Sequence, residues 1–213
     1  MNSIHAENLL LMCKDKPVYD ISKDSILNEN LVPGAILRGT MTFDTWLRTR
    51  YSVGSNTSAR RLMLRAFGAD NHNKDTIRAT RALSLSDCYW LKSQDERVTF
   101  AEVTPYLNQE WDGSGIFKGG SISTLFVNGA ADKKWLDSRT LLKVGSFKEI
   151  EPYRLCAQLG IEYAADVRLS DEGLLLTNFT NTDCFLESME QSGYVGEGEN
   201  ARAKAVELLG RVG

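Results

Sequence analysis

The chain has 213 residues, of which 42% are hydrophobic, so it is long enough to bury a core in one large domain or two small ones. A formal net charge of −3 excludes a protein that attracts nucleic acid through its overall charge. The chain shows no signal-peptide pattern and no apolar run near the ~20 residues that span a bilayer, which predicts a cytoplasmic protein with no membrane partner.

The cysteines are scattered along the chain. Cys13, Cys88, Cys156 and Cys184 form no C-x-x-C pair, and the two histidines are not spaced to complete a metal site with them. We therefore expect no structural metal, and we expect buried free thiols in a reducing compartment.

The N-terminal part of the chain predicts a β-hairpin followed by helices. Residues 8–21 form two short apolar runs around a polar turn at 14–17, which is typical of a hairpin. Residues 42–50 show helical spacing, with Phe43, Trp46 and Leu47 on one face. Residues 56–58 can cap a second helix over 59–67.

Basic residues concentrate in this region. From Arg38 to Arg81 nine basic and three acidic side chains give +6, which leaves −9 for the remainder of the chain. The helical hairpin 42–67, which also contains Arg48 and Arg50, would turn Arg60, Arg61 and Arg65 outward. That pattern fits a solvated helix surface, and it also fits a face that binds nucleic-acid phosphates.

A domain boundary is predicted where glycines cluster, over 112–120. We expect an N-terminal region with the helical hairpin over 1–118, a second domain over 119–190 and a C-terminal helix within 191–213. In the second domain the pattern predicts strands at 133–136 and 139–144, a helix at 152–159 and a hairpin of 161–169 with 174–179. A further helix is expected at 201–209. The fold class is α+β.

Lys143 lies on the second of these strands and precedes the helix. A lysine on an inner strand followed by a helix is how the small lobe of a kinase holds nucleotide phosphates. The order strand, strand with lysine, helix, strand, strand is likewise that of a kinase small lobe.

Four stretches together resemble the HipA-like serine/threonine kinases. They are residues 83–92 (LSLSDCYWLK), the stretch from Asn128-Gly129 to Trp135, Leu142-Lys143, and Glu151-Pro152-Tyr153. The resemblance implies an antiparallel kinase small-lobe sheet with one helix. It also implies a nucleotide site at Lys143 and the backbone of Asn128, Gly129, Ala130 and Ala131.

The sequence departs from this family in two ways. The family's helix carries a glutamate that pairs with the lysine, but Arg154 and Leu155 stand at the last two positions of that motif here. We therefore expect Lys143 to lack its partner. The 70 residues after Lys143 contain no histidine and no catalytic loop, so the large lobe is absent.

These features favour a non-catalytic regulatory protein of a bacterium or its mobile element, with a toxin–antitoxin, prophage or anti-defence role. It would bind a protein partner or itself through Tyr153, Phe179, Phe185 and the helix at 201–209. One alternative is the N-terminal part of an ATP-dependent HipA-like kinase, and another is nucleic-acid binding through the hairpin 42–67. We expect no catalytic residue and no cofactor in such a binding protein, whereas the kinase alternative would bind ATP.

Overall fold

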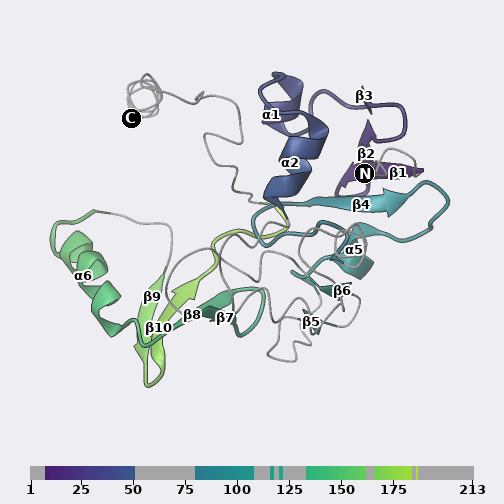
Figure 1. Ribbon diagram of the computed structural model, residues 1–213. Helices are drawn as coiled ribbons and strands as arrows, with labels where there is room; N and C mark the ends of the chain where they lie inside the picture. Colours follow the sequence, from purple (N-terminus) through teal and green to yellow (C-terminus); the bar gives the residue numbers. More distant parts are fainter. Residues whose placement is uncertain are drawn as a thin grey trace.

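The computed structural model describes residues 8–50, 80–107, 116–117, 120–121, 133–161, 166–183 and 186. Within these ranges the fold is α+β, as predicted, with two four-stranded antiparallel sheets, a small two-stranded one and short helices (Figure 1). The predicted helices at 59–67 and 201–209, the loop 128–131 and Phe185 lie outside the described residues.

The first sheet has the order β3-β2-β1-β4. Its strands are β1 (Leu9–Cys13), β2 (Lys16–Asp20), β3 (Ser25–Ile26) and β4 (Tyr89–Ser93). The predicted hairpin is confirmed, since β1 and β2 pair antiparallel across a tight turn at Lys14 and Asp15. Strand β4 pairs with the other edge of β1, so β1 lies between neighbours from distant parts of the chain.

Three helices accompany the first sheet. They are α1 (Gly34–Leu37), α2 (Phe43–Thr49) and α5 (Phe100–Val103). Helix α2 was predicted, and its Phe43, Trp46 and Leu47 are buried in a cluster with Leu11 and Ile21. It begins at Thr42, whose hydroxyl accepts a hydrogen bond from the Thr45 amide. Helix α1 was not predicted, because four residues are too few to show a periodic pattern.

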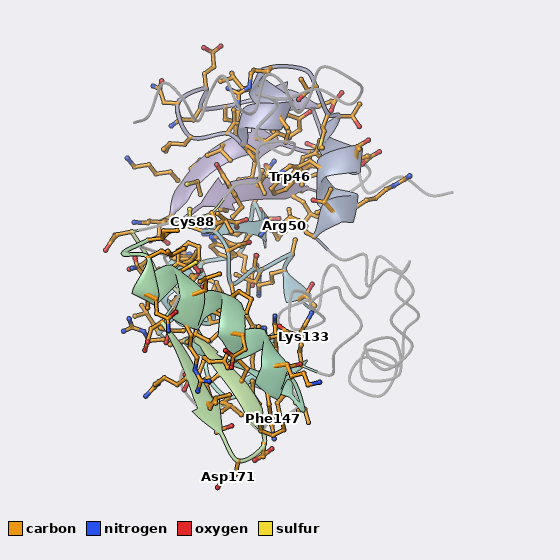
Figure 2. The ribbon with its side chains drawn as sticks, turned by 90° about the vertical axis from the view of Figure 1, so that its left-hand side faces the viewer. Trp46, Arg50, Cys88, Lys133, Phe147 and Asp171 are labelled. Carbon is orange, nitrogen blue, oxygen red and sulfur yellow. The ribbon has the colours of Figure 1, made fainter. Side chains whose placement is uncertain are left out.

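The second sheet has the order β7-β8-β10-β9. Its strands are β7 (Lys133–Trp135), β8 (Thr140–Val144), β9 (Val167–Ser170) and β10 (Gly173–Thr177). Between β8 and β9 the chain forms a 3-10 turn, η3 (Phe147–Glu149), and then α6 (Ile150–Gln158). These elements confirm the predicted strand pair, helix and hairpin, although the helix begins two residues before Pro152. Figure 2 shows α6 lying across a face of this sheet.

Strands β5 (Ile116–Phe117) and β6 (Gly120–Ser121) form the small sheet, within the stretch where the domain boundary is predicted. That boundary, and the division at 118 and 190, stay predictions.

Hydrogen bonds join the segment after β10 to the loop before β4. The Asn178 amide donates to the carbonyl oxygens of Leu85 and Ser138, both at 3.2 Å. The Thr180 hydroxyl also donates to the Leu85 carbonyl, and the Leu186 amide donates to the Ser86 carbonyl at 2.7 Å. These contacts form a junction between the two large sheets.

Candidate functional site

Lys143 has a carboxylate partner, which corrects the sequence-based expectation. Its Nζ lies 2.6 Å from Oε2 of Glu149, and the lysine and glutamate side chains are 22% and 44% exposed. The partner comes from the 3-10 turn before α6, and not from the helix position that Leu155 occupies. Lys143 is therefore paired although position 155 is a leucine.

The turn between β8 and α6 explains how Glu149 reaches Lys143. Gly145 has φ +69, a conformation that glycine adopts without steric cost, and its amide donates to the Glu172 carbonyl at 2.8 Å. The chain then folds back through η3, so that Glu149 returns to the end of β8. A glutamate six residues after a strand lysine gives no periodic signal, so this pair could not be read from spacing.

A second lysine lies beside the pair. Lys133 on β7 is directly opposite Lys143 on β8, so both side chains share one face of the sheet. Burial, followed by the positive charge of Lys143, lowers the pKa of Lys133. The hydrogen bond from Lys143 lowers the pKa of Glu149. The two lysines and one carboxylate carry a net charge of +1, which suits an anionic group such as a phosphate.

Lys134 provides an internal contrast. It is next to Lys133 on β7 and therefore points to the opposite face, where it pairs with Glu172 at 2.9 Å. Lys133 and Lys143 thus lie on one face of the sheet, together with Glu149, and Lys134 lies on the other face.

Helix α6 has one face toward the sheet and one away from it. Ile150, Tyr153, Arg154 and Ala157 line a groove of about 310 Å³ against β9, with Val167, Arg168 and Leu169 on the other side. Leu155 and Leu159 project from roughly the opposite side of the helix, and they are 55% and 64% exposed. The helix therefore carries apolar residues on a face that its own sheet does not cover.

The residues predicted to bind a partner occupy different places. Tyr153 is half-buried in the groove between α6 and β9. Phe179 is 40% exposed and belongs to the junction, between Asn178 and Thr180. Leu155 and Leu159, which present the apolar face of α6, were not selected from the sequence, although their i, i+4 spacing was visible there.

Arg50 does not belong to a basic surface, so it cannot contribute to the nucleic-acid-binding face considered for the hairpin 42–67. Its side chain is buried, and it donates to both carboxylate oxygens of Asp87, at 2.6 and 2.9 Å. It also donates to the carbonyls of Ala82 and Tyr89, and it stacks over Trp46 (Figure 2). Arg48 is exposed, and Arg60, Arg61 and Arg65 lie outside the described residues.

In the part of the chain that the structure describes, none of the helices is long and apolar enough to cross a membrane. Within those same ranges no three His, Cys, Asp or Glu residues gather as a metal site would require. Compared with protein-family models, with curated proteins and with solved structures, the chain matches none of them.

Proposed function

We propose that this chain binds a protein partner through the outer face of α6 and does not itself transfer phosphate. The observation that carries this proposal is the exposure of Leu155 and Leu159, on the side of the helix turned away from its sheet. An amphipathic helix is stabilised when its apolar side is covered, and here the sheet already occupies the side formed by Ile150 and Ala157. The second apolar side is available to another protein.

Exposed apolar residues also lie before and after α6 in the chain. Ile161, two residues after Leu159, is 52% exposed, and Phe147, in the turn before α6, is 45% exposed. Contiguous exposed apolar patches larger than a few hundred Å² usually mark interaction sites. The resemblance to HipA-like kinases supports a regulatory role in a bacterium or its mobile element for such a binding protein.

Self-association offers the most direct test of this surface. We expect sedimentation velocity to show that the wild type associates with itself and that Leu155→Glu/Leu159→Glu remains monomeric. Asp171→Asn, in the exposed turn between β9 and β10, is the matched control and should behave as the wild type. Circular dichroism should be equal for all three proteins, because no side chain that packs against the sheet is changed.

Association that persists unchanged in Leu155→Glu/Leu159→Glu would contradict the proposed surface. Loss of association in Phe179→Asp but not in the helix variant would move the binding surface to the junction.

A second candidate is that the chain is the N-terminal part of an ATP-dependent HipA-like kinase. The ion pair between Lys143 and Glu149 favours it, because it supplies the lysine and carboxylate pair that the resemblance implies. The strand order around Lys143 and the neighbouring charge of Lys133 also support a phosphate-binding role.

Nucleotide binding can be measured by titrating the chain with a fluorescent ATP analogue. If this second candidate is right, Lys143→Ala should weaken binding at least tenfold, whereas Lys134→Ala, on the opposite face of the same sheet, should not change it. Equal affinities for these two variants would contradict the site.

Transfer of labelled phosphate from ATP should stay at background, because the sequence contains no catalytic loop or metal-binding aspartate of the kinase large lobe. Transfer by the wild type that is lost in Lys143→Ala would contradict the proposal that this chain is non-catalytic.

A further inference from the structure

Two cysteine thiols face each other between neighbouring strands of the first sheet. Cys13 ends β1 and Cys88 precedes β4, and their Sγ atoms are 3.2 Å apart. The backbone holds them there, because β1 and β4 pair up to Cys13 and Tyr89 and the Lys14 amide donates to the Cys88 carbonyl at 3.1 Å. A disulfide needs a sulfur separation of about 2.05 Å, so a small side-chain rotation brings the two thiols into bonding range.

The two thiols differ in a way that suits thiol–disulfide exchange. Cys13 is half-buried, whereas Cys88 is buried. The hydrogen bond between the two thiols lowers the pKa of Cys13 and raises the pKa of Cys88. The thiolate, which is the reactive form, is therefore favoured on the more accessible sulfur.

We propose that Cys13 and Cys88 form a reversible disulfide that ties β1 to the loop before β4, which contacts the segment after β10. The Cys13 thiolate attacks one sulfur of a small disulfide oxidant, such as oxidised glutathione, and releases one glutathione as a thiol. The Cys88 sulfur then attacks the Cys13 sulfur of this mixed disulfide, loses its proton and releases the second glutathione. Two protein thiols are oxidised, and one glutathione disulfide is reduced to two thiols.

The position of the bond makes the junction responsive to redox state. Cys88 follows Leu85 and Ser86, whose carbonyls accept the hydrogen bonds from the segment after β10. Lys14, next to Cys13, pairs with Asp183 of that segment at 3.1 Å. Figure 2 places Cys88 where the two sheets meet. Oxidation would thus hold the end of β1 and the loop before β4 together, and both of these contact the segment after β10.

The experiment treats the full folded chain, in which Cys156 and Cys184 are replaced by serine, with oxidised glutathione. We expect both remaining thiols to disappear and the intact mass to fall by two hydrogen atoms, with both changes reversed by dithiothreitol. The melting temperature should rise by about 10 °C, because the bond closes a loop between positions 13 and 88. Cys13→Ala and Cys88→Ala, each in this background, should keep their melting temperature on treatment.

In the wild type, peptide mapping should find Cys13 joined to Cys88. A lasting glutathione adduct in place of the bond, a pairing of Cys13 with Cys156 or Cys184, or a bond that forms only after unfolding in urea would each overturn the proposal.

Discussion

In the first large sheet the hydrophobic residues are mostly buried, whereas in the second few are buried and most are half-buried or exposed. The first sheet and its helices hold two clusters of buried side chains, centred on Trp90 and on Trp46. Among the described residues of the second sheet and α6, the buried hydrophobic side chains are Leu142, Ile150 and Leu174. Exposed apolar residues in that second region are Leu136, Val144, Phe147, Leu155, Leu159, Ile161 and Leu169.

This difference predicts that apolar burial stabilises the two sheets unequally. The first sheet and its helices bury many more apolar side chains than the second, and burial contributes about 25 cal/mol per Å² of apolar area. A sheet with an incomplete core is one that a partner can stabilise, which agrees with the proposed binding surface on α6.

The largest effect should come from emptying the core of the first sheet. Trp90 is fully buried, and its indole nitrogen donates to the Lys14 carbonyl at 2.7 Å. We expect Trp90→Ala to lower the free energy of unfolding by about 4 kcal/mol, through lost burial and a residual cavity. Leu142→Ala in the second sheet should lower it by about 2 kcal/mol. Urea denaturation measures both changes, and a larger loss for Leu142→Ala would contradict the contrast between the sheets.

The ion pairs of the two sheets also differ in burial, since the side chains of Arg50 and Asp87 are more buried than those of Lys134 and Glu172. Replacing Arg50 by methionine removes the partner of Asp87 and leaves that carboxylate poorly solvated. We expect a loss of about 3 kcal/mol in the free energy of unfolding. Lys134→Met, which breaks an exposed ion pair with Glu172 in the second sheet, should cost less than about 1 kcal/mol.

Asp87→Asn in the Arg50→Met background should recover part of the stability, because it removes the unpaired charge. Additive losses in this double variant would contradict the coupling between Arg50 and Asp87.

Backbone conformation sets the cost of replacing Gly173, the first residue of β10 in the second sheet. Gly173 has φ +151, and a Cβ there would lie 2.1 Å from the Lys143 carbonyl oxygen. We expect Gly173→Ala to cost about 2–3 kcal/mol and to displace Lys143. Gly160 has φ +68 with open space around it, so Gly160→Ala should cost about 1 kcal/mol. Thermal unfolding of both variants checks the ranking, and equal costs would argue against the contact at Gly173.

The smallest effect depends on pH and concerns the first sheet. Hydrogen bonds from the Ser22 hydroxyl and from Lys23 lower the pKa of Asp20 to about 2. Because the folded-state pKa is depressed, Asp20 stabilises the fold above pH 3.8, its ordinary pKa, and this contribution is lost as the pH falls to about 2. Asp20→Asn should therefore lower the urea midpoint at pH 5 and change it little at pH 2. A constant difference across this range would contradict the assignment.

Elements with local signals could be predicted from the sequence. The hairpin of β1 and β2 has a polar turn between two apolar runs, and α2 has Phe43, Trp46 and Leu47 at helical spacing. The strands around Lys143 were predicted for the same reason. Each of these signals lies within about ten residues, so no knowledge of the tertiary fold is needed.

Features that depend on distant residues could not be predicted. Arginine is usually exposed, and Arg50 is buried here because Asp87, 37 positions away, returns to meet it. The pairing of Lys143 with Glu149 was not predicted, because Glu149 lies before the helix and reaches Lys143 only through the fold-back of the chain at Gly145. Likewise, the pairing of Cys13 with Cys88 depends on the register between β1 and β4.

The central position of β1 has a consequence for synthesis on the ribosome. One edge of β1 pairs with β2 almost at once, but the other must wait for β4, which begins at Tyr89. At roughly 5–20 residues per second, the nascent chain carries this open strand edge for several seconds or longer. During that interval the unpaired edge of β1 exposes backbone N–H and C=O groups with which a strand of another chain can pair.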